Sequence, residues 1–317
     1  MPPISFIGYE LTPAEIETLR AKMAEANWLF SEVQYAHWRG TQGKVNITAY
    51  LSGKVTFQGA GCEMVAEYFL PGKAAAPSKK QPQARKLDDG RTESALEVAL
   101  RTDPAMFEPH AGIDESGKGD FFGPLVIACA YTDAESAARL LDAGVRDSKL
   151  LSSDAEAKKL ATTIHNVLNG RYSFLIIRPE RLNEMHAQSG NLNSILAWGH
   201  ATALEELLTK VPTCPRAISD QFGRGNLVRR HLKERGKGIA LDEHPKAEAD
   251  IAVAAASILA RAIYIKEVSR LSESCGLTLP KGCSQKVVNT AREFLKLHSK
   301  EALAGYAKTF FKTFEQL

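Results

Sequence analysis

A segment between Pro71 and Thr92 divides this chain, because it contains almost no large apolar side chains. Proline, alanine and polar residues fill it instead, a composition typical of linkers rather than of packed cores. Six Lys or Arg residues outnumber two Asp residues, so the segment could attract a polyanion without specificity, although a solvated tether is the simpler interpretation. We predict a domain at residues 1–71, a basic flexible linker at 72–92 and a second domain at 93–317.

The composition is ordinary for a soluble globular protein, with 44% hydrophobic and 24% charged residues. No apolar run approaches the roughly 18 residues of a membrane-spanning helix, and the first residues lack the basic and apolar regions of a signal peptide. We therefore expect a cytoplasmic monomer without a membrane partner. The five cysteines form no Cys-x-x-Cys pair, which predicts reduced packing residues and neither a zinc site nor a disulfide framework. A formal charge of +3 is too small to indicate a nucleic-acid partner by itself.

The first domain has the pattern of a small α+β unit. Residues 12–15, Thr-Pro-Ala-Glu, form a capping box with proline at the first helical position, and an apolar stripe follows. Residues 44–51 and 54–58 alternate between apolar and polar side chains on either side of a Ser-Gly turn, which predicts two strands. Their apolar face, Leu51 included, should pack on the capped helix and on a second helix near residues 63–69. The polar face should remain open and display Lys44, Asn46, Tyr50 and Lys54.

The second domain alternates strand-like and helical segments. The patterns predict strands near residues 113–115, 125–131, 172–177 and 216–220, and amphipathic helices near 154–168 and 196–208. This alternation indicates an α/β domain with a mixed sheet. The strand order does not follow from one sequence.

Two adjacent carboxylates precede a glycine-rich loop in the second domain. Asp114 and Glu115 end a short apolar run, and Gly117, Lys118 and Gly119 follow. A strand end can direct a carboxylate at a divalent ion, and glycines let backbone amides approach a sugar-phosphate because no Cβ intervenes. The pattern therefore indicates metal-dependent phosphodiester chemistry. It also matches most of a P-loop, but Gly119 stands where a P-loop needs a Ser or Thr hydroxyl, and the two carboxylates would repel the bound phosphates.

Further motifs follow this Asp-Glu-Ser-Gly-Lys-Gly run in order. They are Arg-Asp-Ser-Lys at 146–149, Asn-Leu-Asn at 191–193, Ser-Asp-Gln-Phe-Gly at 219–223 and Ala-Ala-Ala-Ser-Ile-Leu-Ala-Arg at 254–261. The series resembles the ribonuclease HIII family; the related type 2 enzymes usually carry Gly-Arg-Gly where this chain has Gly-Lys-Gly. The resemblance implies a ribonuclease H-like catalytic domain preceded by a TATA-binding-protein-like domain. It also implies an endonuclease that hydrolyses the RNA strand of RNA·DNA hybrids.

The resemblance implies two Mg²⁺ or Mn²⁺ ions held by four carboxylates, with products that carry 5′-phosphate and 3′-hydroxyl ends. Asp114 and Glu115 would be the first two ligands. Because adjacent strand residues point to opposite faces, both can reach one site only if Glu115 lies where the strand gives way to the loop. Asp220 alone would be interpreted as a helix cap or turn former, but its place in the family pattern makes it the third ligand.

The fourth carboxylate has two candidates, Glu248 and Asp250. If residues 247–261 form one helix, these side chains are about 200° apart and cannot face the same site. Asp250 would share a face with the small residues Ala254 and Ser257, whereas Glu248 would suit the first turn as an anion near the helix dipole. We favour Asp250 as the ligand, with Glu248 as the alternative.

Substrate contacts follow from the same resemblance. The backbone of Gly117, Lys118 and Gly119 would contact the ribose 2′-hydroxyl, which distinguishes RNA from DNA, and Lys118 would help to neutralise a phosphate. Lys149 is a weaker candidate for that task. The polar sheet face of the first domain would contact the hybrid backbone, although such a face is otherwise simply solvated. Its candidate contacts are Lys44, Asn46, Tyr50 and Lys54.

Residues 280–283, Pro-Lys-Gly-Cys, lie where type 2 enzymes usually carry a Gly-Tyr pair that packs at the junction between one ribonucleotide and DNA. This departure predicts cleavage within runs of RNA and poor activity on a single embedded ribonucleotide. Three alternatives stay open. They are a type 2 enzyme specialised for single ribonucleotides, a hybrid-binding protein with an inactive nuclease domain and, more remotely, a P-loop ATPase.

Overall fold

The computed structural model describes residues 6–33, 36–73, 85, 91–146, 148, 151–222, 226–244 and 247–317. The chain forms two compact units, residues 1–83 and 84–317, and each contains its own sheet. Residues 74–84 and 86–90 of the predicted linker lie outside the described part of the chain. Within the described part, no helix combines the length and the apolar character that crossing a membrane requires.

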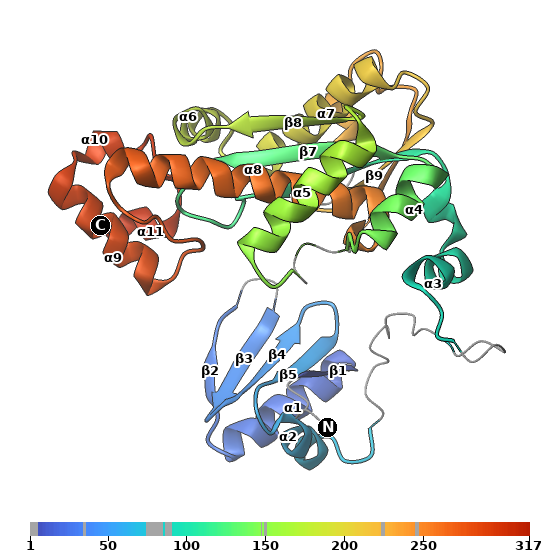
Figure 1. Cartoon of the computed structure of the whole chain (residues 1–317). Helices are drawn as coiled ribbons and strands as arrows, with labels where there is room; N and C mark the ends of the chain where they lie inside the picture. The colour runs from blue at the N-terminus through green and yellow to red at the C-terminus, as the bar shows by residue number, and fades with distance from the viewer. Residues whose placement is uncertain are drawn as a thin grey trace. The chain divides into compact units, whose positions relative to one another are not determined.

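The first unit is a five-stranded antiparallel sheet in the order β1-β5-β4-β3-β2, with two helices packed on one face (Figure 1). The strands are β1 (Phe6–Glu10), β2 (Leu29–Ser31), β3 (Ala36–Gln42), β4 (Val45–Tyr50) and β5 (Lys54–Gln58), and the helices are α1 (Pro13–Glu25) and α2 (Cys62–Phe69). The predicted α+β fold of this unit is confirmed. The sequence patterns revealed only β4 and β5 among its strands.

Helix α1 begins as the capping box predicts. The Thr12 hydroxyl accepts a hydrogen bond from the N–H of Glu15, and the Glu15 carboxylate accepts one from the N–H of Thr12. Gly40 gives α1 room to pack, because a Cβ there would lie 2.2 Å from the Met23 Cε. The prediction that Leu51 faces the core is wrong: it is 62% exposed, because β4 has already ended and Leu51 belongs to the turn.

The second unit contains a five-stranded sheet in the order β10-β9-β6-β7-β8. Its strands are β6 (His110–Ser116), β7 (Leu125–Thr132), β8 (Tyr172–Ile177), β9 (Arg216–Asp220) and β10 (Ala240–His244). The pairs β6–β9 and β9–β10 are parallel, whereas β6–β7 and β7–β8 are antiparallel. The predicted mixed sheet is therefore confirmed, and β10 is a strand that the sequence patterns did not reveal.

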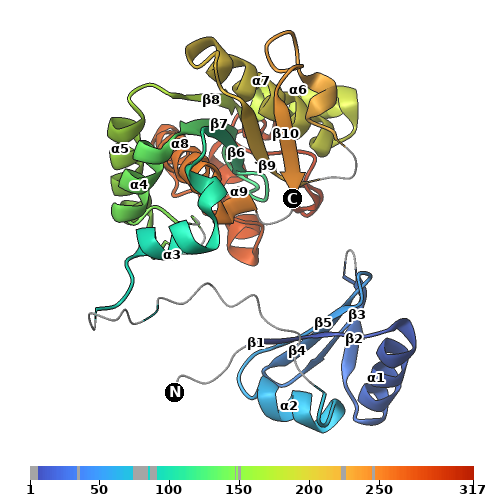
Figure 2. The same ribbon diagram turned by 90° about the vertical axis from the view of Figure 1, so that its right-hand side faces the viewer.

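Helices cover both faces of this sheet, so that two apolar cores lie on either side of it (Figure 2). Helix α7 packs on one face together with α6, and α4, α5 and α8 lie on the other. The helices are α3 (Ala95–Thr102), α4 (Ala134–Asp142), α5 (Asp154–Leu168), α6 (Pro179–Ser189), α7 (Leu192–Lys210), α8 (Ile251–Cys275), α9 (Gln285–Leu297), α10 (Lys300–Leu303) and α11 (Lys312–Glu315). The two helices expected from the sequence correspond to α5 and α7.

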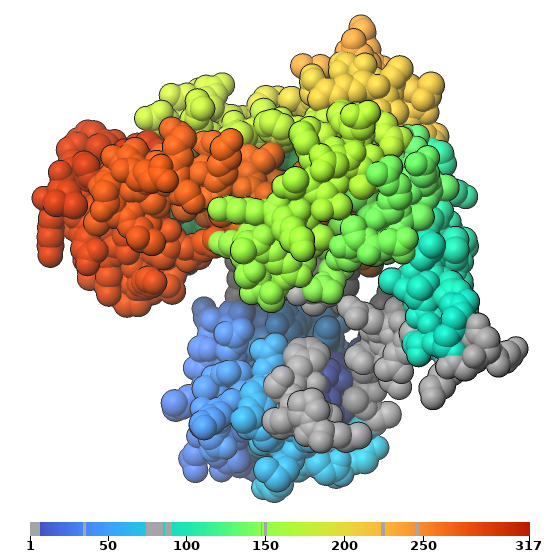
Figure 3. All heavy atoms as spheres, viewed as in Figure 1, coloured from blue at the N-terminus to red at the C-terminus, as the bar shows by residue number. Residues whose placement is uncertain are grey.

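Helix α8 lies directly against β6 and β7. Gly112 of β6 permits this approach, because a Cβ there would lie 2.1 Å from the Val253 nitrogen. Alanine side chains fill much of the first turns of α8 and are buried. Helices α5 and α8 also pack on each other and lie side by side on the face shown in Figure 3. The close contact places the start of α8 beside the strand that carries Asp114.

Candidate active site

Asp114 and Asp220 lie at the ends of neighbouring parallel strands. The last pair between β6 and β9 joins Ile113 to Ser219, so these acids are the next residue on each strand. Ligands of open α/β sheets bind outside the carboxyl ends of strands, where neighbouring strands part. The topology therefore places both carboxylates where a ligand site is expected.

The Asp114 carboxylate lies close to other acids. It accepts a hydrogen bond from the N–H of Glu115 at 2.8 Å, and this bond and the Ser257 hydroxyl of α8 act to lower the pKa of Asp114. Desolvation by the surrounding protein, followed by the charges of Glu115 and Asp220, raises the pKa of Asp114 to about 7. Three acids therefore share one electrostatic environment, which a cation would stabilise.

Glu115 still belongs to β6, where it pairs with Ile127, so its side chain leaves the strand on the face opposite to Asp114. Glu115 was expected where the strand gives way to the loop, and it is the last residue but one of β6. Its carboxylate lies 3.0 Å from His200 Nε2 and 3.4 Å from Lys118 Nζ. Burial opposes ionisation of Glu115, but the hydrogen bond and charge of His200, and then those of Lys118, lower its pKa.

His200 is a residue of the site that the sequence patterns missed. It is fully buried on α7, and its Nδ1 lies 3.0 Å from the Ser219 hydroxyl, beside Asp220. The imidazole therefore connects Glu115 on β6 to the end of β9. No local motif marks it, because a single histidine in an apolar helix has the pattern of a core residue. Ser257 was likewise not assigned a role, although its hydroxyl acts to lower the pKa of Asp114.

The Asp220 carboxylate reaches the segment that precedes α8. Its Oδ1 accepts a hydrogen bond from the N–H of Ala247 at 3.3 Å. Ala247 opens a short 3₁₀ helix, η4 (Ala247–Ala249), whose middle residue is the half-buried Glu248. The backbone beside Glu248 is thus in contact with a predicted metal ligand.

Asp250 has a different set of partners. It caps the N-terminus of α8, where its carboxylate accepts hydrogen bonds from the N–H groups of Ala252 and Val253. The same carboxylate lies 2.9 and 3.0 Å from Nε2 of the fully buried His110. His110 opens β6, and the rise of a strand places it roughly 13 Å before Asp114. The assumption of one helix over residues 247–261 is wrong, because α8 begins only after Asp250.

The acids around Asp114 fit a hard divalent cation in chemistry and in charge. Mg²⁺ and Mn²⁺ prefer carboxylate oxygens, and the charges of Glu115 and Asp220 add to the effect of burial in raising the pKa of Asp114. In the described part of the chain, however, no three His, Cys, Asp or Glu side chains already converge as a closed metal site. Coordination would require the side chains to rotate, and Glu115 in particular to turn away from His200.

The glycine-rich loop follows β6 directly. Gly117 has a φ of +89°, and a Cβ there would lie 2.3 Å from the Pro124 oxygen and 2.8 Å from the Tyr264 ring. Gly119 is exposed, and a Cβ there would meet nothing within 4 Å. The loop leads into the antiparallel strand β7 and not into a helix, so it lacks the helix N-terminus on which a P-loop depends.

The candidate contacts of the first unit lie on or beside β4 and β5. Arg39 of β3 shares their polar face, and its Nε donates a hydrogen bond to the Thr48 hydroxyl at 3.1 Å. The sequence did not reveal Arg39, because a bulge between Ala36 and Trp38 interrupts the alternation of β3. Lys149 of the second unit lies outside the described residues. Of the first-unit candidates, the exposed ones are Lys44 and Lys54, and the half-buried ones are Asn46 and Tyr50.

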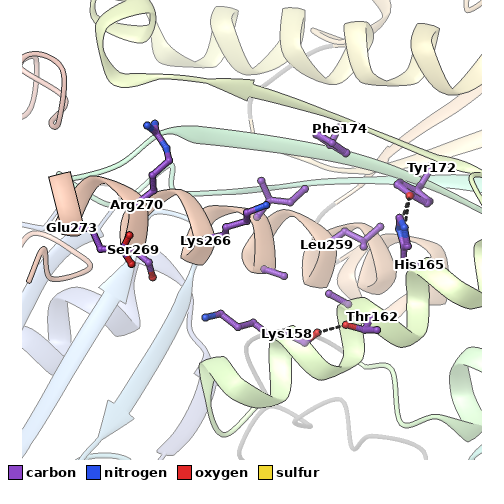
Figure 4. Close-up of a pocket in the computed structure, with 13 residues that line it drawn as sticks. Lys158, Thr162, His165, Tyr172, Phe174, Leu259, Lys266, Ser269, Arg270 and Glu273 are labelled. Carbon is purple, nitrogen blue, oxygen red and sulfur yellow. Dashed lines mark hydrogen bonds between the residues drawn. The ribbon is translucent and has the colours of Figure 1, made fainter.

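A groove of about 810 Å³ lies elsewhere on the second unit, between α5, α8 and β8 (Figure 4). Leu259 and the exposed Phe174 contribute apolar surface, and Lys158 and Lys266 add positive charge. None of the four predicted metal ligands, and no residue of the glycine-rich loop, lines it. The groove is therefore separate from the carboxylate site.

Comparisons with known proteins agree with this geometry. Residues 111–314 match the family model described as Ribonuclease HII, and residues 7–82 match one described as Domain of unknown function (DUF3378). Ribonuclease HIII of Chlamydia pneumoniae is 37% identical over 319 aligned positions, which cover 100% of this chain and 99% of that protein. Ribonuclease HIII of Protochlamydia amoebophila is 34% identical over 96% of this chain and 97% of its own length.

Solved structures share the fold. The crystal structure of Bst-RNase HIII in complex with Mn²⁺ is 27% identical, with a TM-score of 0.63 over 98% of this chain and 97% of that one. Aquifex aeolicus RNase H3, at 21% identity and a TM-score of 0.52 over 95% of this chain and 98% of that one, supports the fold alone. Because a family model matches most of the second unit and relatives above 30% identity match the full length, this chain belongs to the ribonuclease HIII family of the type 2 ribonucleases H.

Proposed function

We propose that this protein hydrolyses the RNA strand of RNA·DNA hybrids with two divalent ions, Mg²⁺ or Mn²⁺, and leaves 5′-phosphate and 3′-hydroxyl ends. The group of acids where β6 and β9 part carries this proposal, because burial and the charges of Glu115 and Asp220 raise the pKa of Asp114 to about 7. Family membership supplies the reaction class. The Mn²⁺ complex of the Bst relative supports a divalent metal.

Each side chain has a defined task in this proposal. Asp114 and Asp220 would hold metal at the strand ends, and Glu115 would join them if its carboxylate turned from His200. The bound ions supply an activated water molecule and positive charge at the leaving 3′ oxygen. Lys118, which lies 3.4 Å from Glu115, is placed to neutralise a phosphate beside these acids.

The fourth ligand is either Glu248 or Asp250, and the contacts favour Glu248. The amide next to Glu248 already binds the Asp220 carboxylate, whereas Asp250 is engaged by His110 and by the first amides of α8. Glu248→Ala should lower kcat about tenfold or more, since even the outer partners of a metal site contribute that much. Asp250→Ala should instead cost roughly 1–2 kcal/mol of stability through the lost cap. Thermal unfolding and kcat of both variants test this, and the reversed pattern would return Asp250 to the metal site.

We propose a preference for runs of RNA over a single embedded ribonucleotide. Cys283 lies beside the glycine-rich loop, where its thiol donates a hydrogen bond to the Gly119 oxygen at 3.1 Å. It is exposed, whereas the other four cysteines are buried as expected for packing residues. A thiol offers no aromatic face to a junction between ribonucleotide and DNA. Efficient nicking of a duplex that contains one ribonucleotide would contradict this preference.

The first unit and the basic linker, at residues 1–71 and 72–92, are proposed to bind the hybrid backbone. The polar face of the sheet supports this role, because Arg39 and the predicted contacts lie on the side opposite to α1 and α2. Recognition would follow backbone shape and charge without sequence preference.

Cleavage of an end-labelled RNA strand paired with DNA tests the whole proposal. Wild type should cut the hybrid at several positions in Mg²⁺ or Mn²⁺ and leave duplex RNA intact, and Asp114→Asn should abolish cutting. Retained hybrid binding without cleavage in either metal would instead identify a binding protein on a nuclease scaffold.

A further inference from the structure

A lysine near the C-terminus has no exposed surface. Lys308 lies between α10 and α11, is 0% exposed and, within the described part of the chain, has no carboxylate at salt-bridge distance. Burial lowers its pKa to about 7, although the charge of Asp120 acts in the opposite direction. Burying an amine is costly unless its donors are satisfied, so the groups that it binds are informative.

The Lys308 amine binds the loop that follows the two adjacent carboxylates of β6. Its Nζ donates hydrogen bonds to the backbone carbonyl oxygens of Asp120, at 2.6 Å, and of Gly123, at 2.8 Å. Its backbone N–H donates to the Phe121 oxygen at 2.8 Å. One residue from the far end of the chain therefore binds three carbonyl groups of residues 117–124.

Other segments bind two more carbonyl groups of this loop. The Tyr264 hydroxyl of α8 donates to the Phe122 oxygen at 3.1 Å, and the Cys283 thiol donates to the Gly119 oxygen. Each carbonyl group of residues 119–123 thus accepts a hydrogen bond from another part of the chain. Among the described residues, by contrast, no protein acceptor binds the N–H groups of Lys118 and Gly119. These hydrogen bonds fix the loop, and the N–H groups of Lys118 and Gly119 remain available to an acceptor oxygen.

We propose that Lys308 is a positioning residue, which holds the loop at residues 117–124 in the conformation that reads the ribose. This inference rests on the proposed function, because it names the residue that aligns the proposed ribose-reading amides. The hydrogen bonds of Lys308 go to the carbonyl groups of Asp120, Phe121 and Gly123, so it would act on Gly117 to Gly119 through the backbone that connects them. Its loss should therefore affect turnover more than hybrid binding, which is dominated by contacts to phosphates.

Lys308→Met in the full chain tests this, with Lys312→Met as the matched control. Methionine fills a similar volume without donors, and Lys312 is an exposed lysine of the same segment. Lys308→Met should lower kcat on the hybrid by roughly 10–100-fold, the effect of a small misplacement in an active site, and leave KM within about threefold. Hydrogen exchange of residues 117–124 should become faster, while exchange in β7 stays unchanged. Lys312→Met should match wild type in every measurement.

Wild-type kcat together with wild-type loop exchange in Lys308→Met would overturn the inference, as would an equal loss in both methionine variants. If Lys308→Met does not fold, Lys308→Arg carries the test, because it keeps the donors but displaces them. A lowered kcat at unchanged KM then supports positioning, and unchanged kcat and loop exchange overturn it. Hydrogen exchange needs no activity, so it still tests Lys308 if wild type fails to cut the hybrid and the proposed function falls.

Discussion

Asp114 lies in surroundings that disfavour its negative charge, because protein atoms exclude water and two other acids lie nearby. The pKa of Asp114 is about 7 in the folded chain, against a reference value of 3.8. The folded state therefore binds the proton more tightly than the unfolded state does. The resulting stability is present below about pH 4 and is lost as the pH rises through about 7.

Asp114→Asn should therefore stabilise the metal-free protein at pH 8. Asparagine cannot ionise, so the variant does not lose stability as the pH rises. Its free energy of unfolding at pH 8 should exceed that of wild type by roughly 1–2 kcal/mol, which corresponds to about 2–8 °C in Tm. The difference should shrink towards pH 4, where Asp114 in the folded wild type is already protonated. Calorimetry in the presence of a chelator measures it. The exposed Asp142→Asn serves as the control, and an Asp114→Asn protein that is less stable than wild type at pH 8 would contradict the pKa argument.

The residues of the site differ in how far the sequence could reveal them. Asp114 and Asp220 were predicted because short motifs mark them, and their assignment as metal ligands stays a prediction. The sequence patterns did not predict His200 as a site residue, because its contact with Glu115 joins positions 85 residues apart. The partners of Asp250 were equally hidden, because His110 lies 140 residues before it.

The turn after β6 depends on glycine at one position and tolerates a side chain at another. Gly117 combines a positive φ with backbone and ring atoms that a Cβ would overlap, whereas Gly119 faces open space. Gly117→Ala should therefore cost roughly 1–3 kcal/mol of stability, and Gly119→Ala should cost little. Thermal unfolding of the two variants compares them, and equal destabilisation would contradict the geometry. If Gly119→Ala keeps wild-type stability, any loss of cleavage reports on contact with substrate.

Local sequence patterns revealed elements of both kinds, among them the amphipathic helix α5 and the wholly buried strand β7. The ranges expected for α5, β8 and β9 agree with the structure, and that for β7 agrees closely. β10 was missed because it is an edge strand with a single buried residue, Leu241. Helix α8 starts later than expected, because Asp250 caps it and the preceding residues form η4.

Binding of the hybrid should depend on the polar sheet face of the first unit. The double variant Lys44→Gln/Lys54→Gln should bind the hybrid more weakly. The slope of log affinity against log salt concentration should fall by about one to two, because each phosphate contact releases roughly one counterion. Turnover at saturating hybrid should stay unchanged, since the carboxylates belong to the other unit. Fluorescence anisotropy between low and high salt measures this. Lys22→Gln on α1, which packs on the opposite face, is the control, and an unaltered salt slope in the double variant would remove this face from the proposed interface.

The division of the chain into two sheets could be predicted, because a local change in composition marks it. The strand order could not, because β6 pairs with β9 across four intervening helices and nothing local encodes that choice. The family resemblance supplied the expected fold where the local patterns stopped.

The position of β6 in the chain has a consequence for synthesis on the ribosome. β6 is the first strand of its sheet to emerge, but its parallel neighbour β9 follows α4 to α7, and α8 and Lys308 emerge later still. Pairings between such distant segments form only after both have been made. A nascent chain that ends before β9 therefore carries Asp114 without Asp220, so these two carboxylates can come together only after β9 has been made.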